Sequence, residues 1–262
     1  MSHRPRKRFG QHFLHDPAVI GRVVATINPA DSEQLVEIGP GQGAITLPLL
    51  QQAGRLAVVE LDRDLVGPLR DRCEDLGELT VYNADALRFD FCELAENGPL
   101  RIIGNLPYNI STPLLFHLLG QHHCIRDMHF MLQKEVVERM AATPGSRQYG
   151  RLTVMLQYRC EVTHLFNIGP GAFTPPPKVE SAFVRLVPYA CPPVQVNDAV
   201  VFEQLVRQAF AQRRKTLRNA LRGMLEADAI SALGIDPVAR AETLSVSEFA
   251  ALANSVPPPG TE

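Results

Sequence analysis

The chain has 262 residues and a mass of 28.9 kDa, with 45% hydrophobic and 21% charged residues and a formal net charge of −2. This length suits one large α/β domain with or without a small appendage, and the composition is that of a globular protein. No apolar run reaches the roughly 18 residues of a membrane span, and no apolar segment follows the basic start, so we expect neither a membrane protein nor a secretory signal.

The cysteines are odd in number, scattered, and without a C-x-x-C pair: Cys73, Cys92, Cys124, Cys160 and Cys191. This pattern argues against a disulfide framework and against a cysteine zinc site, and it favours the reducing cytoplasm. The eight histidines show no metal-ligand spacing either, so no metal is expected.

Charge is distributed unevenly along the chain. Residues 1–30 carry five basic residues and one acidic residue, whereas residues 31–100 carry five basic and fourteen acidic. Residues 204–225 contain six basic side chains and no acid. Two basic ends around an acidic middle favour a polyanion held at both ends, and nucleic acid is the preferred interpretation over a plain solvated surface.

The periodicity alternates between strands and helices over the first 130 residues. A helix is expected after Asp16-Pro17, which supply a cap and a suitable first turn. Short apolar runs predict strands at residues 35–38, 56–59, 79–82, 100–103 and 128–132. Helices are expected at residues 44–52 and 62–75. This alternation predicts a mostly parallel sheet with helices on both faces.

The pattern changes in the last third of the chain. Two further strands are expected near residues 162–168 and 182–187. Prolines cluster at 188–193 and are interpreted as a hinge, after which short helices are expected at residues 198–211, 214–225, 228–233 and 245–254. We therefore predict one domain over residues 1–188 and a small all-helical domain over residues 189–262.

A glycine-rich turn follows the first predicted strand of the sheet. Gly39 and Gly41 allow a sharp turn and the close approach of a ligand, and Glu60 ends the next strand, where a carboxylate can accept hydrogen bonds from a ribose diol. Glu37 just before the turn would repel phosphates but suit a sulfonium. Asp85 follows the third strand and is placed either to accept from an adenine amine or to cap a helix.

A second loop, residues 104–109, follows the fourth strand at the same edge. The side-chain oxygen of Asn105 and the carbonyl of Leu106 can each accept one N–H of a planar exocyclic amine. Tyr108 can stack on the attached base, a contact worth roughly 1–3 kcal/mol. The set fits methyl transfer to an adenine amine, and the alternative interpretation is a plain turn.

Six segments occur in an order that resembles the bacterial small-subunit ribosomal RNA adenine dimethyltransferases. They are residues 8–14, 37–43, 60–62, 83–85, 105–109 and 173–179. The resemblance covers about residues 6–253. It implies a Rossmann-like class I S-adenosylmethionine-dependent methyltransferase domain over residues 1–188 and a helical RNA-binding domain over residues 189–262.

The resemblance also implies an activity and its partner. S-adenosylmethionine would donate four methyl groups to N6 of two adjacent adenosines near the 3′ end of 16S rRNA, in the immature 30S subunit, and the protein would act as a monomer in ribosome biogenesis. The expected cofactor-binding residues are His12, Leu14, Gly39, Gly41, Glu60, Asp85 and Asn105. His12 stands where the family commonly has Asn, so an unliganded loop histidine is the alternative there.

The expected catalytic residues are Asn105, Leu106, Tyr108 and Phe173. Phe173, before the triple proline, resembles the second ring of a pair that holds a flipped adenine, although a lone Phe is also a common core residue. The expected RNA contacts are Arg6, Lys7, Arg8, Arg147, Arg213, Arg214 and Lys215.

Two other functions remain open at this point. One is a non-catalytic assembly factor that binds the small ribosomal subunit. The other is a nicotinamide oxidoreductase, because Gly39, Gly41 and Ala44 also satisfy the dinucleotide pattern G-x-G-x-x-G/A.

Overall fold

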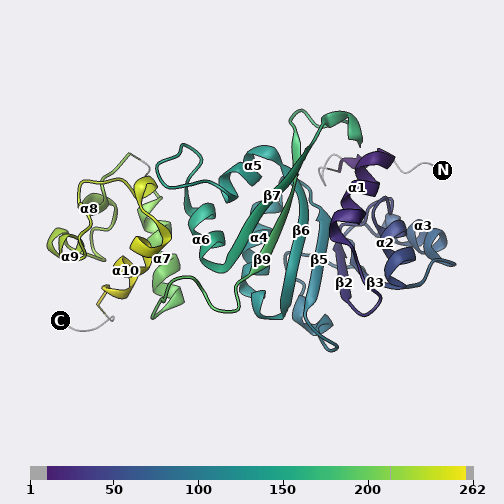
Figure 1. Cartoon of the computed structure of the whole chain (residues 1–262), viewed down its shortest axis with the longest axis horizontal. Coiled ribbons are helices and arrows are strands. Elements are labelled where there is room, and N and C mark those ends of the chain that lie inside the picture. The colour runs from purple at the N-terminus through teal and green to yellow at the C-terminus, as the bar shows by residue number, and fades with distance from the viewer. Residues whose placement is uncertain (1–10, 213, 258–262) are drawn as a thin grey trace. The chain divides into compact units, whose positions relative to one another are not determined.

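The computed structural model describes residues 11–212 and 214–257. The chain divides into two compact units. The described part of the first unit comprises residues 11–137 and 163–188, and that of the second comprises residues 138–162, 189–212 and 214–257. Elements of both are labelled in Figure 1.

A seven-stranded sheet dominates the first unit, in the order β4-β3-β2-β5-β6-β9-β7. Its strands are β2 (Gln34–Ile38), β3 (Arg55–Val59), β4 (Glu78–Tyr82), β5 (Leu100–Asn105), β6 (Ile125–Gln133), β7 (Cys160–Ile168, which begins in the second unit) and β9 (Ser181–Pro188). The first five pair in parallel, and β9 runs antiparallel to β6. The prediction of a mostly parallel sheet is confirmed.

The strand order reverses between β2 and β5, because β3 and β4 extend the sheet on one side and β6 on the other. Such a reversal opens a crevice at the carboxyl ends of the two central strands, which is where ligands bind in open α/β sheets. The residues that follow β2 and end β5 are the glycine turn and Asn105. The topology therefore places both predicted loops at one crevice.

Both faces of the sheet are covered. Ile103 packs in one apolar cluster with Val23 of α1, Leu49 of α2 and Leu69 of α3. Neighbouring residues of a strand point to opposite faces, yet Ile102 and Ile103 are both 0% exposed. Burial on both faces is typical of parallel strands flanked by helices. The helices of this unit are α1 (Pro17–Ile27), α2 (Thr46–Ala53), α3 (Arg63–Cys73) and α4 (Ser111–Gly120), with α5 (Lys134–Met140) at its border.

Local sequence explains the helix ends. Asp16 accepts hydrogen bonds from the N–H groups of Ala18 and Val19, and Pro17 is the first residue of α1. Pro48 lies in the first turn of α2, where its missing N–H costs nothing, and Gly54 ends that helix with a φ of 73°.

A small second sheet joins the N-terminal segment to the triple-proline loop. Strand β1 (Phe13–Leu14) pairs antiparallel with β8 (Phe173–Thr174), and the N–H of His15 donates to the carbonyl of Ala172 at 2.9 Å. No periodicity in two-residue strands announces this pairing, so sequence analysis did not predict it.

The second unit is mainly helical. Its helices are α6 (Arg151–Arg159), α7 (Ala199–Ala209), α8 (Leu217–Ala220), α9 (Ala227–Ala232) and α10 (Val246–Asn254). Aromatic contacts form its core, with ring centroids of Tyr158 and Phe202 4.6 Å apart and those of Phe210 and Phe249 5.5 Å apart. Within the described residues, no helix is both long and apolar enough to cross a bilayer.

The C-terminal region differs from the sequence prediction in the length of one helix. The helix expected over residues 214–225 is wrong in length, since only Leu217–Ala220 is α-helical and Gly223 has a φ of 85°. The expected domain boundary at residue 188 coincides with the end of the first unit, while residues 138–162 group with the second. The assignment of catalytic and RNA-binding roles to these domains stays a prediction.

The expectation of a chain without disulfides is wrong for one pair. Cys92 and Cys124 form a disulfide across a sequence separation of 32 residues. Their spacing gave no signal because the pairing depends on tertiary structure, which brings η2 (Phe91–Leu94) against η3 (His122–Cys124). Cys73, Cys160 and Cys191 are free.

Close packing at Gly104 of β5 supports the crevice. A Cβ there would lie 2.8 Å from the carbonyl oxygen of Ile38 and 2.7 Å from Leu106 Cδ2. We expect Gly104→Ala to lower the free energy of unfolding by about 1–3 kcal/mol, because backbone must move to admit the methyl group. Urea denaturation measures this loss. Gly21→Ala in α1 meets no atom within 4 Å, and should instead raise stability by about 1 kcal/mol; equal effects at the two sites would contradict the argument.

Candidate active site

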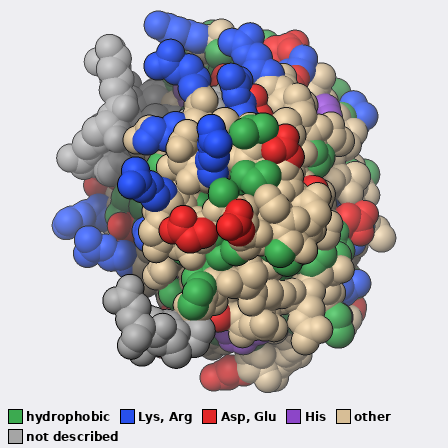
Figure 2. Space-filling view, turned by 90° about the vertical axis from the view of Figure 1, so that its left-hand side faces the viewer, with side chains coloured by type: hydrophobic (Ala, Val, Ile, Leu, Met, Phe, Trp, Pro, Cys, Tyr) green, Lys and Arg blue, Asp and Glu red, His purple; other side chains and the backbone are tan. Residues whose placement is uncertain are grey.

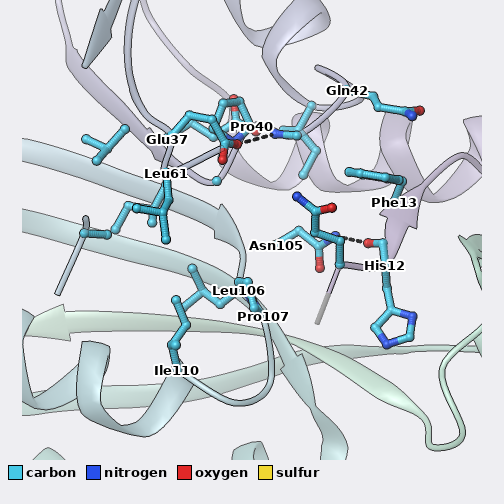
Figure 3. A pocket seen from close by; sticks show the side chains of 18 of the residues that line it. His12, Phe13, Glu37, Pro40, Gln42, Leu61, Asn105, Leu106, Pro107 and Ile110 are labelled. Carbon is cyan, nitrogen blue, oxygen red and sulfur yellow. Dashed lines mark hydrogen bonds between the residues drawn. The ribbon is translucent and has the colours of Figure 1, made fainter. Parts of the chain in front are cut away.

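One pocket of about 280 Å³ lies at the carboxyl edge of the sheet. It is built from the N-terminal segment at residues 11–14, the glycine turn after β2, the end of β3, the turn after β4, and the loop after β5. Figure 3 shows its side chains. The strand ends determine which segments meet, so side chains far apart in sequence face a common space.

The structure brings together all seven residues predicted to bind the cofactor. The predicted residues among those that line the pocket are His12, Leu14, Gly39, Gly41, Glu60, Asp85 and Asn105, with Leu106 and Tyr108 of the predicted catalytic set. Their individual roles stay predictions, but their proximity follows directly from the fold.

Phe173 is the exception. Its side chain is 2% exposed and packs in the core cluster with Leu14, Phe166 and Phe183. A ring buried to this extent has no free face on which a base can stack. In this structure Phe173 does not line the pocket that Tyr108 lines, and its expected role as a second stacking ring stays a prediction.

The glycine turn approaches its ligand space because two of its residues adopt left-handed backbone conformations. Gly39 and Gly41 have φ values of 66° and 57°, a region that favours glycine. The ring of Phe13 packs against Gly41, where an added Cβ would lie 3.1 Å from two ring atoms. A larger residue at position 41 would therefore push the N-terminal segment away from the turn.

Two buried carboxylates make the pocket acidic. Glu37 is 2% exposed, and its Oε2 accepts a 2.6 Å hydrogen bond from the hydroxyl of Thr46. Burial, opposed by the hydrogen bond from Thr46 and reinforced by the nearby charge of Glu60, raises the pKa of Glu37 to about 7. This arrangement penalises an added anion and favours a cationic ligand.

Glu60 is held in place by its own turn. Its carboxylate accepts hydrogen bonds from the N–H groups of Asp62 at 2.8 Å and Gly41 at 3.2 Å. Burial raises the pKa of Glu60, and these two bonds oppose that shift. Asn83 joins the end of β4 to the end of β3 by donating to the carbonyl of Glu60 at 2.7 Å.

Asp85 accepts a hydrogen bond from the N–H of Leu87 at 3.0 Å and so fixes a turn after β4. The expected helix cap is in fact this turn cap, since no helix begins there. Only Oδ1 is engaged in that bond, and the side chain also lines the pocket.

The side chain of Asn105 has a defined orientation. Its Nδ2 donates to the carbonyl of His12 at 2.9 Å, as the dashed line in Figure 3 shows. A carbonyl only accepts, so the amide nitrogen must face His12 and Oδ1 faces elsewhere. Among the described residues, none donates to Oδ1. Asn105 can therefore offer an acceptor to a ligand amine.

Contacts from segments that are distant in sequence hold the ring of Tyr108, in the loop after β5, in place. The hydroxyl of Tyr108 shares a 2.7 Å hydrogen bond with Ser181, and the Tyr108 ring stacks on His12 with centroids 5.5 Å apart. Nδ1 of His12 donates to the carbonyl of Pro175 at 2.7 Å. Ser181 and Pro175 are not among the predicted site residues, because no local sequence pattern indicates either contact.

The expected RNA contacts are located only in part. Arg6, Lys7, Arg8 and Arg213 lie outside the described residues. Arg147, Arg214 and Lys215 belong to the second unit and are exposed. Their role in RNA binding stays a prediction.

Comparisons with known proteins place this fold among the class I methyltransferases. A solved dimethyladenosine transferase from Plasmodium falciparum superposes with a TM-score of 0.78 at 27% identity, covering 92% of this chain and 96% of that one. A 23S rRNA methyltransferase superposes with a TM-score of 0.71 at 24% identity, which supports the fold alone. The expected Rossmann-like methyltransferase fold is confirmed.

Sequence relatives specify the family. The model for ribosomal RNA adenine dimethylases matches residues 2–257. Proteins named ribosomal RNA small subunit methyltransferase A are similar: one from Pseudomonas aeruginosa is 55% identical, covering 97% of this chain and 95% of its own length, and one from Nitrosococcus oceani is 57% identical, covering 96% of each. This chain belongs to the ribosomal RNA adenine dimethylase family, which decides against the nicotinamide oxidoreductase.

The buried Glu37 predicts a pH dependence of stability. Its pKa is about 7 in the folded chain and near 4.5 when unfolded, so above pH 4.5 the unfolded state loses its proton first. The contribution of Glu37 to the free energy of unfolding is at its maximum below about pH 4.5. It falls by about 3 kcal/mol in total as the pH rises through 7.

We expect Glu37→Gln to remove this loss while keeping an acceptor for Thr46. Urea denaturation at about pH 5 and about pH 8 measures it, and the drop in unfolding free energy should be smaller in the variant. Glu78→Gln, on the exposed start of β4, is the control and should behave as the unmodified chain does. Identical pH profiles for all three would refute the assignment to Glu37.

Proposed function

We propose that this chain transfers methyl groups from S-adenosylmethionine to N6 of two adjacent adenosines near the 3′ end of 16S rRNA, four methyl groups in all. Membership in the ribosomal RNA adenine dimethylase family supports rRNA as the substrate class. One observation carries the mechanism: Asn105, whose Oδ1 receives no hydrogen bond from the described residues, lines the same pocket as the carboxylates of Glu37 and Glu60.

The pocket residues fit this cofactor chemically. Buried carboxylates at Glu37 and Glu60 favour a cation and a ribose diol, and the glycine turn admits a ligand close to its backbone. Asp85 lines the same pocket and would accept from an adenine amine. When bound, S-adenosylmethionine supplies an activated methyl group on a positively charged sulfur.

Residues 104–109, at the end of β5 and in the loop that follows it, would orient the target amine. Oδ1 of Asn105 and the carbonyl of Leu106 would each accept one N–H, which orients the nitrogen and favours a geometry with an available lone pair. Tyr108 would stack on the base and, through its ring face, favour the positive charge that develops on the nitrogen. No strong general base is needed, because the alkylated amine is acidic enough to lose its proton to water.

The contacts of Asn105 support a role in orienting the target amine rather than in transferring its proton. Nδ2 donates a hydrogen bond to the carbonyl of His12, so the side-chain amide of Asn105 already has a fixed orientation before the substrate binds. The hydrogen bond between Tyr108 and Ser181 restrains the ring, and the one from His12 to Pro175 restrains the N-terminal segment.

We expect Asn105→Ala to lower methyl transfer by about 100-fold or more, in line with the loss of one preorganised polar group from an active site, while RNA binding persists. Incorporation of labelled methyl groups into small subunits that lack the modification measures transfer, and filter binding measures affinity for the rRNA. Asn97→Ala, an exposed residue outside the pocket, is the control.

A full-rate Asn105→Ala enzyme would end this mechanism. The same variant addresses the alternative of an assembly factor: if it restores subunit assembly in cells that lack the protein, binding alone carries that role. Mass spectrometry of the rRNA then shows whether dimethyladenosine is absent.

We also propose that the second unit contributes to RNA binding, with the protein acting as a monomer on the immature 30S subunit. Its basic residues Arg207, Arg214, Lys215, Arg218 and Arg222 are all exposed. In the view of Figure 2, Lys and Arg side chains (blue) are most frequent toward the upper left. Such side chains neutralise phosphates and release counterions, which positions an RNA without reading its sequence.

Replacing Arg214 and Lys215 together by Ala should weaken rRNA binding and flatten its dependence on salt, because up to two phosphate contacts are lost. The slope of the logarithm of affinity against the logarithm of salt concentration should fall by about 1–2. Arg55→Ala and Arg63→Ala in the first unit serve as charge-matched controls. An unchanged slope in the double variant would make these side chains a plain solvated surface.

A further inference from the structure

Three potential metal ligands gather at the amino edge of the sheet, opposite to the pocket. Cys92 lies in η2 before β5, and His123 and Cys124 lie in η3, which leads directly into β6. Their ligand atoms all lie within 4.8 Å of one another, and Cys92 Sγ is 3.4 Å from Nε2 of His123. The proposed methyl transfer uses none of these side chains.

Hydrogen bonds that do not involve sulfur already join the two segments. The side chain of Gln121 accepts from the N–H of Phe91 at 2.7 Å and donates to the carbonyl of Phe89 at 3.2 Å. His117 bonds to the same carbonyl at 2.8 Å. These side-chain contacts hold the two segments together in addition to the disulfide.

The donor set is specific in its chemistry. Two thiolates and one imidazole are soft or borderline ligands that suit Zn²⁺, whereas Ca²⁺ and Mg²⁺ require oxygen. Bond lengths of about 2.3 Å to sulfur and about 2.0 Å to nitrogen in a tetrahedron separate S from N by roughly 3.5 Å and S from S by roughly 3.8 Å. The first value matches the present Cys92–His123 distance of 3.4 Å, and the second requires the disulfide to open.

We propose that the reduced chain binds one zinc-class divalent cation through Cys92, Cys124 and His123. A dithiol reductant first passes two electrons and two protons to the disulfide, which yields two thiols and leaves the reductant oxidised. The cation then displaces both thiol protons to solvent and binds Nε2 of neutral His123. This site departs from the sequence expectation of no metal, since its ligands meet only in the folded chain.

The surroundings leave room for a fourth ligand. Cys92 and His123 line a pocket together with Asp90 and His117, so a water molecule can complete the tetrahedron. Cys124 is buried, Cys92 is half-buried and His123 is exposed. A cation therefore reaches the cluster from solvent and, once bound, is held on its inner side by the protein.

The test is a titration of the full chain with Co²⁺, a spectroscopic substitute for Zn²⁺, after anaerobic reduction. We expect one ion per chain, a thiolate-to-cobalt charge-transfer absorption, the visible bands of a tetrahedral ion, and displacement by Zn²⁺. Cys92→Ser and Cys124→Ser should each weaken binding by roughly 100-fold or more, since loss of a direct ligand exceeds the usual 10–100-fold cost of losing an outer partner. Cys191→Ser, an exposed free thiol, is the matched control and should bind normally.

A second measurement needs no variant. In the reduced unmodified chain, Zn²⁺ should slow alkylation of Cys92 and Cys124 but not of Cys191, as mapped by mass spectrometry. His123→Gln should weaken this protection. The proposal is overturned if the reduced chain shows no thiolate-to-cobalt absorption, or if alkylation of Cys92 and Cys191 is equally indifferent to Zn²⁺; the pair would then be a disulfide only.

Discussion

The hydrogen bond from Nδ2 of Asn105 to the carbonyl of His12 is the contact on which the site depends. It joins the end of the central strand β5 to a segment that is 93 residues away in sequence. The bond both restrains the N-terminal segment over the pocket and determines which side of the amide faces a ligand. Without this bond, the side-chain amide of Asn105 could rotate by half a turn and present Nδ2 instead of Oδ1 to the ligand.

Other contacts make that one bond possible. His12 has its ring against Tyr108 and its Nδ1 on Pro175, while the adjacent strand β1 pairs with β8. The triple-proline loop therefore acts as a support for the N-terminal segment, and Phe173 becomes part of the core beneath it.

The predictable part of the molecule is the part that local rules control. Strand ends, the glycine turn and the proline-rich loop were read from periodicity and residue type, and parallel pairing then required the loops after β2 and β5 to meet. Contacts such as Ser181 with Tyr108, or Cys92 with Cys124, span 73 and 32 residues and involve residue types that occur everywhere. Only the tertiary structure selects those pairs, so no pattern could announce them.

The acidic pocket illustrates how a binding site costs stability. Burial raises the pKa of Glu37 and that of Glu60, and the pKa of about 7 for Glu37 leaves this group partly protonated near neutral pH. A cationic ligand in the same pocket would stabilise the carboxylate instead, and the proton and the cation would then compete for one electrostatic site. The same desolvation that weakens the empty fold therefore strengthens the attraction for a positively charged ligand, because both effects arise from removing water from the carboxylates.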